Sequence, residues 1–229
     1  MQNIVFIHGA LGDASQMKNF STFFEIKYHV HIINLPGHGV DSGHDAAFNM
    51  QSLVDVVANE IREKQLKEVI VFGFSMGGYI GMCLAKQHPT LISTLITIGT
   101  KYEWSTDIAL AQAGFFDTNT IEAKQPAFAA QLSALHGENW KSVVEKTGHL
   151  IQALGNTPLL HDDDYKNISC PTMIMLGDKD RMVTLAETIH VFKQLPNGSL
   201  CILPKTPHPF EQLDGAVLSN IVKHFLVGS

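Results

Sequence analysis

The sequence has few cysteines and few arginines, and each scarcity argues against a class of function. Its cysteines, Cys83, Cys170 and Cys201, show no C-x-x-C spacing and have apolar neighbours. This is typical of buried free thiols rather than disulfides or metal ligands. The only arginines are Arg62 and Arg181. A site that clamps a polyanion usually contains bidentate arginine, so the scarcity favours a neutral or largely apolar small-molecule substrate.

Long apolar runs and basic clusters are also missing. No run of about 18 apolar residues occurs, so we expect no membrane span. No basic segment precedes the apolar residues 3–7, so we expect no signal peptide and a cytoplasmic protein. The net charge of -6 is mild and no Lys/Arg cluster occurs, which argues against nucleic acid as a partner. The 12 histidines lack metal-ligand spacing, so neither a metal nor another cofactor is expected.

What the chain does contain is the pattern of an α/β protein. With 229 residues, 45% of them apolar, it can bury one sizeable core, which predicts a single domain over residues 1–229. Strand patterns alternate with helical patterns along the chain. The strands are expected at 3–7, 29–35, 69–72, 91–98, 172–176 and 200–203. The helices between and after them are expected at 15–28, 53–66, 79–86, 185–195 and 216–226. Such alternation gives parallel pairing through right-handed crossovers. We therefore expect a mostly or wholly parallel sheet of about six strands with helices on both faces.

The alternation stops between residues 101 and 166. This segment has no convincing strand and shows helical spacing at 108–116, 121–135 and 140–154. It predicts a helical cap insertion, 101–166, in a core formed by residues 1–100 and 167–229. A strand-free segment of this length is usually functional. Its aromatic residues could line a pocket or could simply hold the insertion to the core.

A serine between two glycines stands at one strand-to-helix junction. Residues 69–72 suit a strand buried on both faces, and helical spacing begins at Tyr79. Between them lies Gly73-x-Ser75-x-Gly77. So tight a turn strains the serine backbone and leaves no room for side chains two residues away. It lifts the hydroxyl clear of the sheet and directs helix amides at a neighbouring oxyanion, which predicts a nucleophile of acyl transfer.

Further chemistry-bearing loops also follow strands. They are His8-Gly9-Ala10, the turn from Gly177 to Asp180, and the loop that contains His208. Because the carboxyl ends of parallel strands share one edge, we expect these loops to converge with Ser75 where open α/β sheets bind ligands. A serine nucleophile needs a general base in reach, and the base needs a carboxylate to orient it.

Together these motifs resemble the α/β-hydrolase fold superfamily over nearly the whole chain, in particular its small serine carboxylesterases and monoacylglycerol lipases. The resemblance rests on Phe6-Ile7-His8-Gly9, Leu35-Pro36-Gly37-His38-Gly39, Gly73-Phe74-Ser75-Met76-Gly77-Gly78, Gly177-x-x-Asp180 and His208. It implies that Ser75 is the nucleophile, Asp180 the acid and His208 the base. It also implies an oxyanion hole formed by the N–H groups of Ala10 and Met76, with Leu11 as the alternative to Ala10.

The chain departs from the family pattern at two points. It starts at what is usually the third strand, which is why six strands are expected. His208 follows Pro207 where the family commonly has glycine; proline fixes the backbone there but leaves the imidazole free. Asp178 is an alternative acid, although family spacing and the expected turn geometry favour Asp180.

Other polar residues near these motifs have simpler interpretations. Asp13 can cap the helix that follows it, and residues 162–164 form a solvated face or a helix start. His8 and His38 belong to the family turn motifs and are interpreted as structural.

The function predicted is that of a serine hydrolase acting on a small, mostly uncharged carboxylic ester through an acyl-enzyme on Ser75. One alternative is a C–C bond hydrolase or a cofactor-biosynthesis lyase with the same triad. Another is a non-catalytic small-ligand receptor on the same fold, because fold alone does not determine function. The candidates to contact the substrate are Leu11, Trp104, Phe115, Phe116, Trp140 and Met182.

Overall fold

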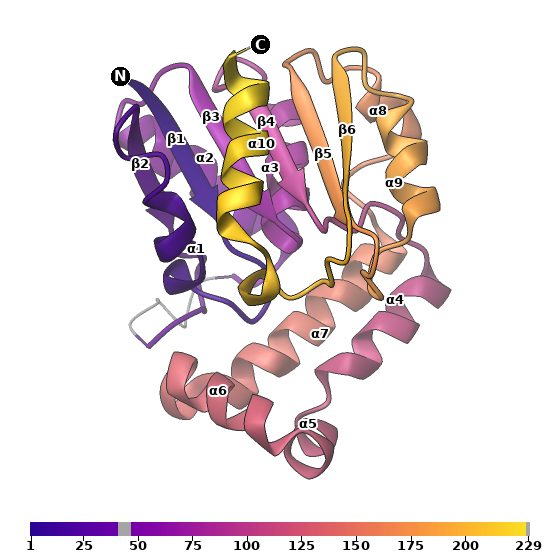
Figure 1. The fold of residues 1–229 in the computed structure, drawn as a ribbon. Coiled ribbons are helices and arrows are strands. Elements are labelled where there is room, and N and C mark those ends of the chain that lie inside the picture. Colours follow the sequence, from indigo (N-terminus) through magenta and orange to yellow (C-terminus); the bar gives the residue numbers. More distant parts are fainter. Residues whose placement is uncertain (41–46, 228–229) are drawn as a thin grey trace.

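The computed structural model describes residues 1–40 and 47–227, and its centre is a six-stranded parallel sheet (Figure 1). The strand order is β2-β1-β3-β4-β5-β6. The strands are β1 (Gln2–Ile7), β2 (Tyr28–Ile33), β3 (Val69–Phe74), β4 (Ile92–Ile98), β5 (Thr172–Gly177) and β6 (Gly198–Leu203). Every pairing is parallel, so the carboxyl ends of all six strands lie along one edge. The predicted sheet is confirmed.

Helices cover both faces of this sheet because alternate strand residues point to opposite sides. On one face Val5 and Val71 share a core cluster with residues of α2 (Met50–Glu63), α3 (Met76–Gln87) and α9 (Leu185–Phe192). On the other face Phe6 and Phe72 pack with α1 (Ala14–Ser21) and α10 (Gly215–Val227). Figure 1 shows α1 and α10 in front of the sheet and α2 and α3 behind it.

Helix α1 is shorter than the 15–28 segment predicted for it. Asp13 caps its start as expected, because its carboxylate accepts from the Ser15 N–H. After Ser21 the chain forms turns with hydrogen bonds between residues three positions apart; for example, the Lys27 N–H donates to Phe24 O at 3.0 Å. These turns place the Phe24 side chain in the core, where it is 1% exposed. Tertiary packing therefore ends the helix early.

The segment between β4 and β5 is helical, as predicted, and lies beyond the carboxyl ends of the strands (Figure 1). The predicted 121–135 helix is divided, because Pro126 has no N–H to donate and disfavours helical backbone at Gln125, whose φ and ψ are -137° and 56°. Residues 162–164 are a helix start. The elements are α4 (Thr106–Ala113), η1 (Gly114–Phe116), α5 (Thr118–Lys124), α6 (Pro126–His136), η2 (Gly137–Asn139), α7 (Trp140–Asn156) and α8 (Asp162–Tyr165).

Within residues 1–40 and 47–227, none of the helices combines the length and the apolar character needed to span a bilayer. No membrane-spanning helix was expected from the sequence, and the described residues contain none.

Candidate active site

Ser75 stands between β3 and α3 on a strained backbone, with φ 50° and ψ -114°. Its N–H donates to Ile98 O at 2.9 Å, which ties the turn to the neighbouring strand β4. A Cβ on Gly73 would overlap the backbone of Gly77, and a Cβ on Gly77 would overlap the carbonyl of Ile7. The spacing of glycine and serine thus reflects the lack of space around the turn.

Gly78 is a third position where the turn excludes a side chain. A Cβ there would overlap Thr100 Oγ1, just after β4, and would lie 3.1 Å from Gly73 O. Gly78 belongs to the family motif, but its contact with Thr100 was not predictable from the sequence. The start of α3 can therefore approach the strands closely enough to hold Ser75 at their edge.

His208 and Asp180 meet in the loops that follow β6 and β5. His208 Nδ1 lies 2.7 Å from Asp180 Oδ2. The other carboxylate oxygen accepts from the N–H groups of Met182 at 2.8 Å and Val183 at 2.9 Å. The Asp180 side chain is 1% exposed, so its orientation is set by these bonds. A carboxylate at Nδ1 selects the tautomer that carries its proton there, and Nε2 is then an acceptor.

Asp178, the alternative acid, has different partners. Its Oδ1 accepts from the Thr206 N–H at 3.2 Å, and its Oδ2 lies 3.5 Å from Lys179 Nζ. Asp178 therefore joins the loop after β5 to the loop after β6. Of the two aspartates, it is Asp180 that the structure brings to His208.

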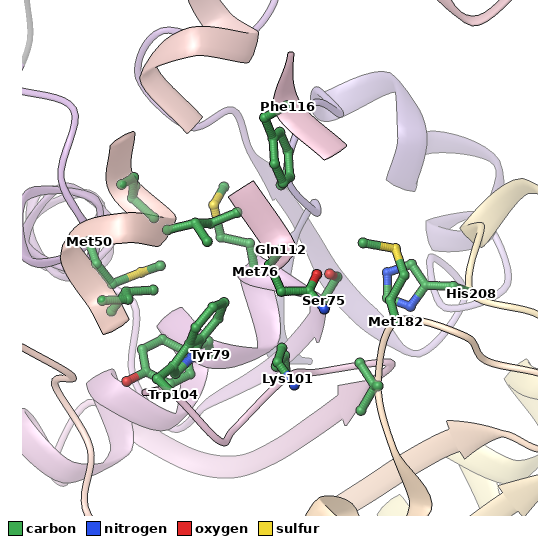
Figure 2. A pocket seen from close by; sticks show the side chains of 15 residues that line it. Met50, Ser75, Met76, Tyr79, Lys101, Trp104, Gln112, Phe116, Met182 and His208 are labelled. Atoms are coloured by element: carbon green, nitrogen blue, oxygen red, sulfur yellow. The ribbon is translucent and has the colours of Figure 1, made fainter. Parts of the chain in front are cut away.

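Ser75 and His208 line the same cavity, which has a volume of about 60 Å³. Figure 2 shows Ser75, Met182 and His208 on one side of it and Met50, Tyr79 and Trp104 on the other. The remaining lining residues are Ala10, Met76, Lys101, Gln112, Phe116, Leu150, Ile151, Leu154 and Val183. Because most of these side chains are apolar, the cavity suits an apolar group next to Ser75.

Three of the predicted substrate contacts line this cavity: Trp104, Phe116 and Met182. Phe115 does not, since its side chain is 61% exposed on the adjacent position of the short 3-10 helix η1, where neighbouring residues point in different directions. Trp140 does not either; it is buried at 8% exposure with Ile121 and other residues of the insertion.

Leu11, also proposed as a contact, packs against that same cluster of the insertion, which contains Leu132 and Val144. It follows Ala10, which does line the cavity. Leu11 has a φ of 59°, so the loop after β1 turns sharply at this residue. The Gly12 N–H closes the turn by donating to Gly9 O at 3.2 Å.

One residue of the cavity wall, Lys101, forms an ion pair that was not predicted from the sequence. Lys101 Nζ lies 2.9 Å from Glu187 Oε2, and Glu187 Oε1 accepts from the Tyr102 N–H at 3.1 Å. The two side chains are 13% and 2% exposed. The spacing Thr184-x-x-Glu187 at the start of α9 is a capping-box pattern, but no local pattern in the sequence indicates that Glu187 pairs with Lys101. The positive charge of Lys101 at the cavity is therefore neutralised by Glu187.

Two buried histidines stabilise the loops beside Ser75. His8 Nε2 accepts from the Leu35 N–H at 3.0 Å and its Nδ1 donates to Gly9 O at 2.8 Å, which requires a neutral ring. Burial lowers the pKa of His8 to about 4. Burial likewise lowers the pKa of His38 to about 3. Both rings act in packing and backbone hydrogen bonding, in agreement with the structural role expected from the sequence.

Among the described residues, no group of three or more histidine, cysteine, aspartate or glutamate side chains could hold a metal ion. The three cysteines are free thiols, and burial raises the pKa of each.

The chain belongs to the alpha/beta hydrolase fold family, whose model matches residues 2–143. A Haemophilus influenzae protein with the provisional name esterase/lipase is 35% identical over 97% of this chain and 82% of its own length. The pimeloyl-[acyl-carrier protein] methyl ester esterase of Vibrio atlanticus is 23% identical over 96% of this chain and 93% of its own. The crystal structure of NosK from Streptomyces actuosus matches with a TM-score of 0.84 and 23% identity, covering 98% of this chain and 97% of that one. The protein is thus an α/β-hydrolase by sequence family and by fold.

Proposed function

We propose that this α/β-hydrolase cleaves a small, mostly uncharged carboxylic ester through an acyl-enzyme on Ser75. The observation that carries the proposal is the joint placement of Ser75 and His208 on one apolar cavity, with Asp180 bonded to His208 Nδ1. Serine acylation needs these elements: a hydroxyl on a strained turn, an acceptor nitrogen beside it, and a carboxylate that stabilises imidazolium.

The reaction follows from the protonation states in this arrangement. His208 Nε2 takes the proton from Ser75 Oγ as the oxygen attacks the ester carbonyl, and Asp180 stabilises the imidazolium. The tetrahedral intermediate collapses, and the leaving alcohol receives that proton. Water then attacks the acyl-enzyme and gives a proton to His208. The second tetrahedral intermediate collapses, His208 returns that proton to Ser75 Oγ, and the carboxylic acid is released.

The oxyanion of each intermediate would be bound by the N–H groups of Met76 and Ala10. Met76 is the first residue of α3, where the amides of the first turn lack partners within the helix and favour negative charge. Ala10 lines the cavity with Ser75, while the Leu11 side chain packs into the insertion. This difference favours Ala10 over Leu11 as the second donor.

The dimensions and charge of the cavity support a short, neutral acyl group. A volume of about 60 Å³ is several times the ~15 Å³ that holds one water molecule, so it accommodates a few heavy atoms. Glu187 neutralises Lys101, and the other lining residues apart from His208 are uncharged. The helical insertion at 101–166 supplies Trp104, Phe116 and the residues of α7 to this lining, and we propose that it acts as a cap that sets substrate size.

A panel of p-nitrophenyl esters of increasing acyl length tests the proposal directly. We expect turnover of short esters and a decline as the chain lengthens. Ser75→Ala should lower kcat by a factor of about 10⁴ to 10⁶ and leave the thermal transition in place, and a fluorophosphonate should label Ser75 in the wild type. Labelling at another residue would refute the nucleophile. If no ester is turned over, a C–C hydrolase, a lyase or a non-catalytic receptor becomes the better account.

A further inference from the structure

His136, the last residue of α6, joins the insertion to two loops of the core. It is fully buried. Its Nδ1 accepts from the Gly39 N–H at 2.8 Å, so the ring proton is on Nε2, which lies 3.0 Å from Leu11 O and donates to it. One imidazole thus connects α6 with the loop after β1 and the loop after β2.

The loop that receives this bond is the turn from Gly9 to Gly12, which has an intrinsically unfavourable conformation. Leu11 at its third position has a φ of 59°, where a Cβ is disfavoured and glycine is usual. The single bond within the turn joins Gly12 N–H to Gly9 O. Contacts from outside must therefore hold Leu11 in place, and His136 supplies a direct hydrogen bond to it.

Buried histidines hold both ends of this turn. At the Gly9 end, His8 donates to Gly9 O at 2.8 Å. At the Leu11 end, His136 donates to Leu11 O. The His38 ring lies between them, 5.0 Å from His8 and 6.1 Å from His136 measured between ring centroids. The two donors belong to different parts of the chain, since His8 is in the core and His136 is in the insertion.

We propose that His136 is a positioning residue that holds the Gly9–Gly12 turn so that the Ala10 N–H is directed at the oxyanion. The inference rests on the proposed function, because it is the ester reaction that gives the Ala10 amide its role. A donor in the oxyanion hole acts only when it is pre-oriented, so loosening the turn should weaken transition-state binding and leave substrate binding largely unchanged.

Two variants separate the bond to Leu11 from the bond to Gly39. The side-chain amide of glutamine reaches the place of Nε2, so His136→Gln keeps a donor for Leu11 O. The shorter side chain of asparagine reaches the place of Nδ1, so His136→Asn keeps an acceptor for the Gly39 N–H and loses the donor. Val143→Ala is the control for a general loss of packing in the insertion, because Val143 is buried at 2% exposure in α7 but is not part of the cluster that Leu11 packs against.

We expect His136→Asn to lower kcat about tenfold or more with little change in KM, and His136→Gln to stay within about threefold of the wild type. Affinity for a boronic-acid inhibitor, which imitates the tetrahedral state, should fall in the asparagine variant alone. Val143→Ala should lose thermal stability and keep its kcat. The inference is overturned if folded His136→Asn has the wild-type kcat, or if all three variants lose activity in proportion to stability.

Amide hydrogen exchange at Gly12 tests the same inference without any reaction. Its N–H is bonded to Gly9 O, so exchange should be faster in His136→Asn than in His136→Gln. Equal rates would overturn the positioning role. Should the wild type turn over no ester, the proposed function fails alone, and the exchange rates still decide whether His136 holds the turn.

Discussion

His208 Nδ1 lies 2.7 Å from Asp180 Oδ2, although the two residues are 28 positions apart in the sequence. Parallel pairing of β5 with β6 accounts for this, because Gly177 is opposite Leu203 and the loops that follow leave the sheet side by side. Asp178 lies at the base of the same loop and bonds to the Thr206 N–H. The two aspartates therefore have different partners as a result of their distance from the end of the strand.

Exchanging each aspartate for asparagine should separate these roles. Asp180→Asn should lower kcat by about 10⁴, because an amide can donate to Nδ1 and stabilise the tautomer with its proton on Nε2, which cannot accept from Ser75. Asp178→Asn should change kcat little and mainly loosen the two loops. Steady-state kinetics on a short ester, with thermal melts of both variants, provide the measurement. The reverse ranking would assign the acid to Asp178.

Close packing at Gly78 predicts a second pair of variants. Gly78→Ala should destabilise the fold by about 1–3 kcal/mol, because its Cβ would overlap Thr100 Oγ1. Gly114→Ala is the matched control: no atom lies within 4 Å of the added Cβ, and Gly114 already has helical backbone with a φ of -60°. Its stability should be unchanged or slightly raised.

Urea unfolding measures both variants, and Thr100→Ala tests the cause. Removing the Thr100 hydroxyl should recover part of the stability lost in Gly78→Ala, since the nearest remaining atoms lie about 3.1 Å away. If Gly78→Ala is as stable as Gly114→Ala, the contact with Thr100 does not limit the side chain at this position.

The buried histidines predict that stability declines on acidification. Burial lowers the pKa of His8 to about 4 and of His38 to about 3, from 6.5. Between pH 6.5 and those values the unfolded chain binds the extra protons, so the free energy of unfolding falls as the pH falls. At pH 5 each histidine would reduce it by about 2 kcal/mol relative to neutral pH.

His38→Asn should flatten this dependence, because the asparagine amide can still donate to Pro36 O and does not titrate. His149→Gln, on an exposed side chain of α7, is the control and should keep the wild-type slope. Urea unfolding between pH 7 and pH 5 gives the slopes. An unchanged slope in His38→Asn would show that His38 does not contribute to the acid sensitivity.

The parts of the site that were predictable from the sequence are those that follow local rules. The turn at Ser75 needs glycines within two residues, so its chemistry is visible as a motif. The convergence of the Gly177–Asp180 turn and the His208 loop was predictable because each follows a strand and parallel strands end at one edge, whereas the choice of Asp180 and His208 within those loops came from the family resemblance. Neither inference needed a side-chain contact between distant segments.

The contacts that escaped prediction join the insertion or a distant helix to the core. His136 bonds to Leu11, 125 positions away, and Lys101 to Glu187, 86 positions away. The hydrophobic periodicity of the sequence does not indicate such pairs, because they depend on how helices with similar apolar content pack together. The same limit explains why Trp140 was taken for a substrate contact when it packs within the insertion.

Phe115 and Phe116 provide the last test, because the two neighbours differ in where their side chains lie. Phe116 lines the cavity with Ser75, whereas Phe115 is 61% exposed. If the insertion sets substrate size, Phe116→Ala should enlarge the cavity and shift the preference toward longer acyl chains by about tenfold in kcat/KM, with little change for the shortest ester. Phe115→Ala removes the same atoms from the surface and should keep the wild-type profile. The ester panel measures both, and identical profiles in the two variants would show that the insertion contributes packing and does not select the acyl chain.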